Sequence, residues 1–201
     1  MDKQIKDIIN NLINEYEYVN EGSIPSIDLY MDQVTTFIDD SFMKYTDKKD
    51  EKLLTKTMIN NYTKAGLLPR PQNKKYNKEH IILLILIYHY KNFVSIKDSK
   101  DLLDPIKNIC ESEDSLDTLV SVYEEICNNN NNCKKKLVKD INEKITYIEK
   151  NTKSGSSRDS LEIKEAFSLF NMLAYDVFNK KRIMDELISY IQSQSAYETD
   201  K

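Results

Sequence analysis

The sequence predicts an all-α protein, and three observations lead to this fold class. Only three glycines and four prolines occur among 201 residues, whereas sheets need frequent turn signals. Apolar residues recur at spacings of three and four, without the alternating apolar and polar runs that are typical of strands. With 40% hydrophobic and 31% charged residues, the chain is expected to be globular rather than disordered.

Two amphipathic helices are expected first. Residues 2–19 place apolar side chains on one helical face, and Gly22 and Pro25 end this helix. A second helix is expected to bury one face, made of Ile27, Tyr30, Met31, Val34, Phe37 and Ile38. The charged residues 44–52 are expected to form a loop.

The middle of the chain predicts a helix, an extended segment and two further helices. Thr55 or Thr57 can cap a helix that runs to Ala65 and stops at Gly66. Two prolines force residues 69–71 to be extended. Asn77 caps a helix over residues 78–92, which is apolar almost all round and should be the buried centre. Ser95 and Asp98 form a capping box for a short helix that ends near Leu103, where Pro105 stops it.

The C-terminal half predicts helices near residues 115–127, 133–150 and 159–193. The asparagine run 128–132 and the segment Lys153–Ser160 are expected to be the loops between them. The last helix is longer than average, and helices of this length commonly pack against a partner or a bundle.

Positive charge gathers in the middle of an acidic chain. Residues 52–100 have a formal charge of +8, whereas the whole chain has −4. Such a segment is expected of a surface that faces phosphates, although a solvated lysine-rich face would give the same balance.

The helix 55–65 has a polar face suited to DNA. Met58, Tyr62 and Ala65, with Ile59 at the border, are expected to bury against residues 81–88. Asn60 and Asn61 are predicted to contact bases, because asparagine can bond bidentately to adenine. The other predicted DNA-binding residues hold phosphates or position the helix: Lys56, Thr57, Lys64, Arg70, Lys74 and Lys75. The alternative is a solvated helix face. Tyr76 is expected to anchor the arm 70–76 into the core.

Residues 54–103 resemble the DNA-binding domain of MerR-family regulators. The matching residues are Tyr62, Gly66, Leu67, Leu68, Tyr76, Asn77, Glu79, Ser95, Ile96, Leu102 and Leu103. The resemblance implies a helix-turn-helix with a wing that binds double-stranded DNA. Asn60 stands where that family has an arginine, and the wing is shorter. The phrases IDLYMDQVTTFIDD and LTKTMINNYTKAGLLP also resemble a bacterial domain family of unknown function, DUF1836, from about Ser26 to Ile191.

The predicted function is therefore a sequence-specific transcriptional regulator, in the simplest case a repressor that acts as a homodimer. Residues 1–25 would form an N-terminal helix, residues 26–104 the DNA-binding domain, and residues 105–201 a C-terminal helical bundle that dimerises. The alternative is a helical adaptor that keeps the helix-turn-helix shape but binds a protein.

Other function classes are not expected from the sequence. The chain has no Cys-x-x-Cys pair, no glycine-rich phosphate loop and no nucleophile with an evident base, so neither an enzyme nor a cofactor or metal is predicted. His80 and His89 are interpreted as structural. The longest apolar stretch, residues 81–88, is far below the roughly 20 residues that span a membrane. Three cysteines without metal-ligand spacing are typical of reduced cytoplasmic thiols.

Overall fold

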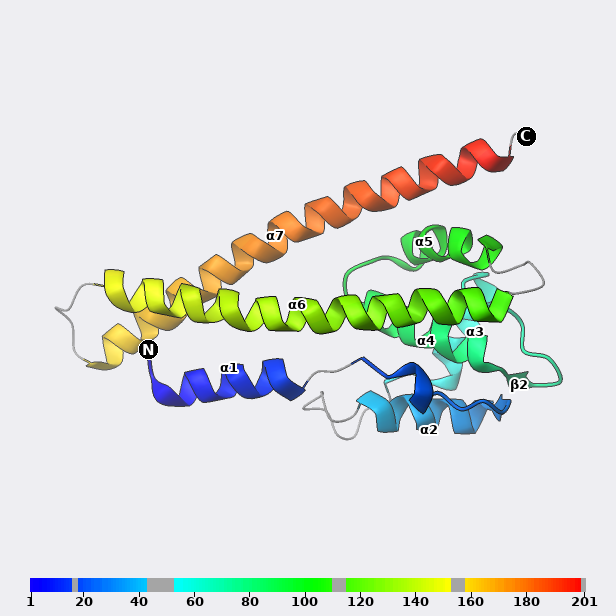
Figure 1. The fold of residues 1–201 in the computed structure, drawn as a ribbon, viewed down its shortest axis with the longest axis horizontal. Coiled ribbons are helices and arrows are strands. Elements are labelled where there is room, and N and C mark those ends of the chain that lie inside the picture. Colours follow the sequence, from blue (N-terminus) through cyan, green and yellow to red (C-terminus); the bar gives the residue numbers. More distant parts are fainter. Residues whose placement is uncertain (16–17, 43–52, 110–114, 153–157, 200–201) are drawn as a thin grey trace. The chain divides into compact units, whose positions relative to one another are not determined.

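The computed structural model describes the chain except residues 16–17, 43–52, 110–114, 153–157 and 200–201. The described chain is all-α with one small two-stranded sheet, which confirms the predicted fold class (Figure 1). Its elements are α1 (Lys3–Glu15), the 3-10 helix η1 (Glu21–Ser23), β1 (Leu29–Tyr30), α2 (Met31–Phe42), α3 (Lys56–Lys64), β2 (Lys75–Tyr76), α4 (Lys78–Tyr90), α5 (Ile96–Ile109), α6 (Ser115–Asn151) and α7 (Arg158–Thr199).

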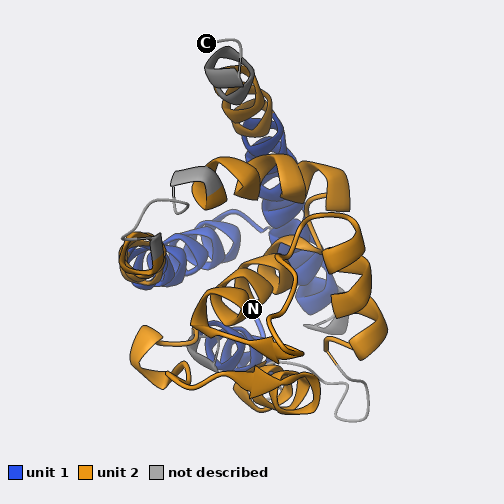
Figure 2. Ribbon diagram, turned by 90° about the vertical axis from the view of Figure 1, so that its right-hand side faces the viewer, with its two compact units in different colours: residues 1–17, 129–185 blue, residues 18–128, 186–201 orange. Residues whose placement is uncertain are grey.

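The chain divides into two compact units, shown in Figure 2. Unit 1 comprises residues 1–17 and 129–185, and unit 2 comprises residues 18–128 and 186–201. Helices α6 and α7 each contribute to both units. The predicted domains 1–25, 26–104 and 105–201 divide the chain differently, since each unit combines residues from more than one of them.

Helix α4 is the buried centre of unit 2, as predicted. All seven residues from Ile81 to Ile87 are at most 2% exposed. A helix that is apolar on every side must be surrounded, and α2 and α3 supply part of the enclosure. Val34 and Ile38 of α2 and Ile59 of α3 are each completely buried in the same core.

The two-stranded sheet was not predicted from the sequence. Leu29 pairs with Tyr76, and Tyr30 pairs with Lys75, in antiparallel register. Because side chains alternate along a strand, Leu29 is buried while Tyr30 is 54% exposed. The prediction that Ile27 and Tyr30 share the buried face of a helix is therefore wrong, since both precede α2 and are exposed.

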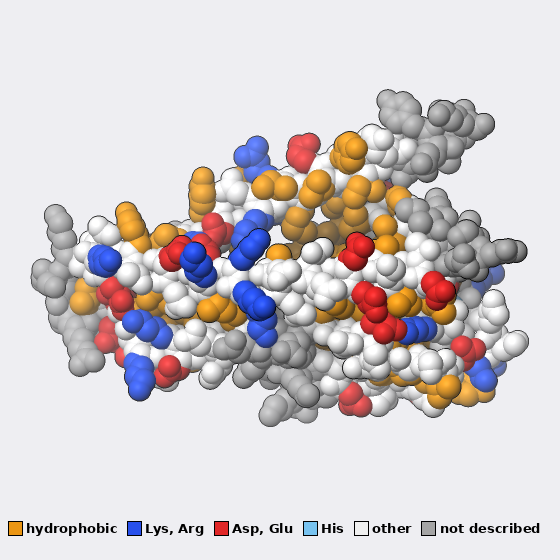
Figure 3. Space-filling view, viewed as in Figure 1, with side chains coloured by type: hydrophobic (Ala, Val, Ile, Leu, Met, Phe, Trp, Pro, Cys, Tyr) orange, Lys and Arg blue, Asp and Glu red, His pale blue; other side chains and the backbone are white. Residues whose placement is uncertain are grey.

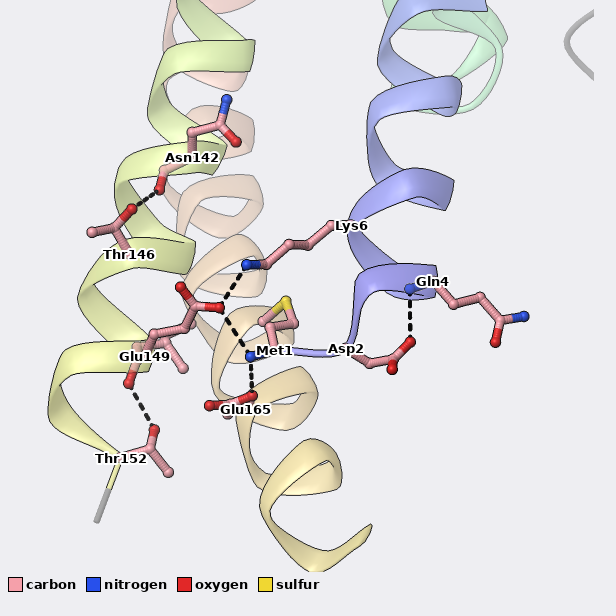
Figure 4. A network of polar contacts seen from close by, with 10 residues as sticks. Met1, Asp2, Gln4, Lys6, Asn142, Thr146, Glu149, Thr152 and Glu165 are labelled. Atoms are coloured by element: carbon pink, nitrogen blue, oxygen red, sulfur yellow. Dashed lines mark hydrogen bonds and ion pairs between the residues drawn. The ribbon is translucent and has the colours of Figure 1, made fainter. Parts of the chain in front are cut away.

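Unit 1 has its own small core. Ile141, Ile145 and Ile148 of α6 pack with Leu169 of α7, and residues of α1 cover them. A polar network lies beside this core (Figure 4). The amine of Met1 lies 3.0 Å from Glu149 and 2.5 Å from the buried carboxylate of Glu165. The hydrogen bond from Lys6, followed by that from the Met1 amine, holds the pKa of Glu149 below its usual value.

The asparagine run is helical, so the predicted loop at residues 128–132 is wrong. Helix α6 continues through it for 37 residues. An asparagine inside a helix costs no more than about 0.7 kcal/mol relative to alanine. Packing before the run offsets this cost, because Tyr123 is fully buried and its hydroxyl donates to the Val19 carbonyl at 2.6 Å. Ile141 and Ile145 anchor the same helix after the run.

Pro105 does not stop α5, contrary to the prediction. The helix continues to Ile109 with the proline inside it. A proline removes one backbone hydrogen bond, but the residues after it make contacts that keep the helix in place. Ile106 packs on the core of unit 2, and the Lys107 ammonium donates to the Gly66 carbonyl at 3.0 Å.

Several predicted boundaries lie at the edge of the described residues. The predicted loop 44–52 and most of the predicted loop Lys153–Ser160 fall outside them, while residues 158–160 already belong to α7. Helix α1 ends at Glu15, and residues 18–20 are not helical, so the first helix is shorter than the predicted 2–19. Among the helices described, none combines the length and apolar character needed to cross a membrane.

Candidate nucleic-acid interface

Helix α3 is capped at both ends. The Thr55 hydroxyl accepts a hydrogen bond from the Met58 backbone N–H at 3.2 Å, which selects Thr55 over Thr57 as the cap. At the other end Gly66 has a φ of 72°, a left-handed conformation that favours glycine. The predicted limits of this helix are therefore confirmed.

The segment before α3 is fixed through Leu53. Its backbone N–H donates to Asp39 of α2 at 3.0 Å, and its carbonyl accepts from the Lys91 ammonium at 3.1 Å. The next residue, Leu54, is completely buried. These contacts tie the start of α3 to α2 and to the end of α4.

Helix α3 presents two distinct faces. Ile59 and Tyr62 are at most 4% exposed. Ile59 thus lies in the centre of the buried face rather than at its border, and the prediction that Ala65 is buried is wrong, since it is exposed. The five polar candidates of this helix are all exposed and span an arc of about 140° on the opposite side: Lys56, Thr57, Asn60, Asn61 and Lys64.

The arm after α3 forms a tight turn. Gln72 and Lys75 are bridged, and the two residues between them have positive φ, 51° at Asn73 and 63° at Lys74. Two consecutive positive φ values are typical of the type I′ turn of a short hairpin. Arg70 and Lys74 are exposed on this hairpin, while Tyr76 is 3% exposed, which confirms Tyr76 as its anchor.

Lys75, the eighth candidate, is half-buried. Its ammonium lies 5.4 Å from the ring centroid of Tyr30, on the paired strand. Tyr30 is therefore an exposed aromatic residue beside the hairpin, although the sequence pattern predicts it on the buried face of a helix. Alternation over a two-residue strand is too short a signal to have revealed it.

An acidic residue lies against the candidate face. The Lys56 ammonium forms an ion pair with Asp32 of α2, and both side chains are more than half exposed. Nothing in the spacing of the sequence indicated this pair, because a 24-residue separation brings the two side chains together only through the packing of α2 on α3.

Two lysines of α5 lie at the C-terminal end of α3 and were also missed. Lys107 donates to the Gly66 carbonyl, and the Lys100 side chain would lie 3.2 Å from a Cβ placed on Gly66. Both pair with Asp104 on their own helix. They add positive charge near Lys64, although Asp104 offsets part of it.

The two histidines are part of the scaffold of unit 2. The Asn77 side chain accepts from the His80 backbone N–H at 3.1 Å, and the His80 ring in turn receives the Asn77 backbone N–H, which confirms that His80 serves the start of α4. His89 stacks on Tyr18 with ring centroids 4.0 Å apart. Burial lowers the pKa of His89 to about 4, so the ring is neutral at physiological pH.

Fold and surface together define a helical protein whose α3 presents an exposed, basic and amide-rich face. A family model matches residues 19–126, more than half of the chain, and the chain therefore belongs to the DUF1836 family, a domain of unknown function. The match nearly coincides with the continuous segment 18–128 of unit 2, and ends well before the predicted limit at Ile191. Comparison with curated proteins and with solved structures gave no match.

Proposed function

We propose that this protein binds double-stranded DNA in a sequence-specific manner through α3 and regulates transcription. One observation carries the proposal: the buried face of α3 is locked into the core of unit 2, while every polar candidate on the opposite face is exposed. A recognition helix requires this arrangement, because base readout needs side chains held at a fixed position on a rigid element.

The chemistry of the face suits a DNA major groove. The groove is about 12 Å wide and admits an α-helix. Asn60 and Asn61 offer amides that can pair with adenine N6 and N7, each good bidentate contact contributing about 1–3 kcal/mol of discrimination. Lys56 and Lys64 lie at the two ends of the helix, where they can reach the phosphates on either side of the groove.

The hairpin after α3 supports the same proposal. Arg70 and Lys74 project from a turn whose base is held by the β1–β2 pairing and by buried Tyr76. A basic hairpin beside a recognition helix can lie along the flanking backbone, as in the MerR-type wing that residues 54–103 resemble. Each phosphate contact there adds to the salt dependence of binding.

We further propose that the protein acts as a homodimeric repressor. One helix of nine residues covers few base pairs, and specific sites usually combine two half-sites that a symmetric dimer recognises. Occlusion of a promoter needs no domain beyond those that bind DNA and dimerise. Such a role would place the protein in the cytoplasm.

A second candidate function, a protein-binding adaptor, is favoured by two observations. The Asp32–Lys56 ion pair makes this part of the surface mixed in charge, and Ile27 and Tyr30 expose apolar surface on the segment before α2. A protein partner would use such a mixed surface, whereas DNA would repel Asp32. The two functions differ in their dependence on salt and on DNA sequence.

The experiment that separates them is fluorescence anisotropy of the full chain with two labelled duplexes. One carries the region upstream of the protein's own gene, and the other is a scrambled duplex of equal length. From about 50 to 200 mM salt, phosphate-dominated binding weakens steeply. The DNA proposal predicts tight, salt-sensitive binding that prefers the upstream duplex. Absence of binding to either duplex at the lowest salt would contradict it and favour the adaptor.

A further inference from the structure

Helix α7 carries an exposed apolar stripe within unit 1. We name as the α7 seam the residues Ile163, Phe167, Phe170, Ala174 and Val177, which follow one another at spacings of four, three, four and three. Ile163, Phe167 and Phe170 are 65–71% exposed, and Val177 is 64% exposed. Figure 3 shows hydrophobic side chains at the surface along this helix. Single exposed apolar residues are normal, but a continuous stripe marks an interaction surface.

The exposure of the seam is a consequence of how unit 1 packs. The opposite face of α7 is occupied, because Leu169 lies in the core with Ile145 of α6. Lys144 of α6 also pairs with Asp176 of α7 at 2.9 Å, which fixes the rotation of α7 about its axis. At about 100° per residue, the seam points away from this face. It cannot turn inward without breaking the core of unit 1.

The spacing of the seam favours another helix as its partner. Apolar residues that alternate at three and four form the a and d positions of a heptad, which packs against a second helix. In this heptad, position a is occupied by Phe167 and Ala174, and position d by Ile163, Phe170 and Val177. The next residue at position a is Lys181. A lysine at one a position is a known determinant of register in two-stranded coils, and here its ammonium pairs with Asp185 on the same helix.

The area of the seam fits a pair of identical helices. The four large seam residues and the adjacent Phe178 are about two-thirds exposed. At about 150 Å² or more for each large side chain, they expose roughly 500 Å² per copy. Two copies would bury roughly 1,000 Å², about the smallest area expected of a specific interface.

The flanking charges fit a parallel arrangement. In a parallel, in-register pair each g position faces the e position of the following heptad on the other helix. This rule places Lys180 opposite Asp185 of the second copy, and Leu173 opposite Phe178 of the second copy. The first pair is opposite in charge and the second is apolar, with Leu173 also packed against the core of its own unit 1.

We infer that the α7 seam is a homodimer interface in which α7 of one copy pairs in parallel with α7 of a second copy. A parallel pair brings the C-terminal parts of both α7 helices, which belong to unit 2, to the same end of the pair. The inference rests on the homodimer proposed above and names its interface, but it depends on the packing of unit 1 and does not require α3 to bind DNA.

The test is the mass of the full chain in solution, measured by light scattering and by sedimentation equilibrium. The wild-type chain should have twice the mass of the 23.6 kDa monomer. Phe170→Glu should raise the dissociation constant of the dimer at least about 100-fold, because it would bury a carboxylate in the seam. Tyr175→Glu is the matched control, since Tyr175 is 70% exposed on the same helix but lies off the seam. Circular dichroism checks that both variants keep their helix content.

The orientation is tested by a cross-link at the first seam residue. In a chain whose three cysteines are replaced by serine, Ile163→Cys should form a disulfide with the same residue of the second copy when oxidised with copper-phenanthroline. An antiparallel pair would keep the two cysteines far apart, so a dimer that does not cross-link would overturn the parallel arrangement. A monomeric wild-type chain, or a dimer that Phe170→Glu leaves intact, would overturn the interface itself.

Discussion

The ammonium group of Lys56 on α3 pairs with the carboxylate of Asp32 on α2. Lys56 is one of the residues predicted to hold DNA phosphates, and the pair connects it to an acidic side chain of the neighbouring helix. It contributes little to stability, because exposed ion pairs contribute at most about 1 kcal/mol. Its consequence for function is larger, since Asp32 competes with a DNA phosphate for Lys56.

Substitution Asp32→Asn should therefore tighten DNA binding. Release of Lys56 is expected to increase affinity about two- to five-fold at low salt. The plot of log affinity against log salt should steepen by up to about 0.9 if Lys56 then reaches a phosphate. Anisotropy titrations measure both quantities.

The control for this prediction is Asp40→Asn, which removes the same charge from an exposed position of α2. Asp40 lies eight residues further along the helix, about 12 Å away. If both variants gain affinity equally, net charge rather than the Lys56 pair is responsible.

Burial of His89 predicts that the protein loses stability in acid. Its pKa is lowered to about 4 in the folded chain from the ordinary value of 6.5. Between these pH values the unfolded chain therefore binds more protons than the folded chain. The contribution of His89 to the free energy of unfolding is therefore complete above pH 6.5 and is lost as the pH decreases towards 4. At pH 4.5 this residue alone should reduce it by about 2.5 kcal/mol.

His89→Phe should weaken this pH dependence while keeping the stack on Tyr18. Urea unfolding at pH 7 and pH 4.5 measures the difference for each protein. Some dependence should remain, because burial also lowers the pKa of His80. An unchanged difference in the variant would show that His89 does not titrate as described.

The left-handed turn after α3 predicts that replacing Gly66 by a residue with a side chain destabilises the protein. Its φ of 72° disfavours a side chain at this position, whereas the Lys100 Cε, 3.2 Å from a Cβ placed there, is the end of a flexible side chain that can move aside. Gly66→Ala should lower the free energy of unfolding by about 1–2 kcal/mol. Gly22→Ala is the matched control, because Gly22 has no positive φ and its Cβ would meet Asn20 at an ordinary 3.4 Å. Equal effects of the two substitutions, measured by denaturant unfolding, would count against the turn as the cause.

Local signals in the sequence predicted much of unit 2. Thr55, Gly66 and Asn77 have side-chain or backbone properties that fix the ends of α3 and α4 directly. The all-round apolar pattern of residues 81–87 was sufficient to place α4 at the centre. The exposed set on α3 followed from helical periodicity alone.

The errors occurred where distant packing outweighs local preference. Pro105 remains helical because Ile106 and Lys107 make contacts within unit 2, and the asparagine run remains helical because α6 is anchored on both sides. The strand pairing of Leu29 with Tyr76 and the Asp32–Lys56 pair depend on residues 47 and 24 positions apart. Periodicity in one segment carries no information about such partners.

The most direct test of the proposed function is the ratio of affinities for the upstream and the scrambled duplex, compared between the wild type and the double variant Asn60→Ala, Asn61→Ala. If α3 contacts bases through these amides, the ratio should fall by at least about five-fold, while affinity for the scrambled duplex stays close to that of the wild type. Asn142→Ala, at an exposed position of α6, should leave both affinities unchanged. A double variant that keeps the full wild-type ratio would contradict base contact by the α3 asparagines.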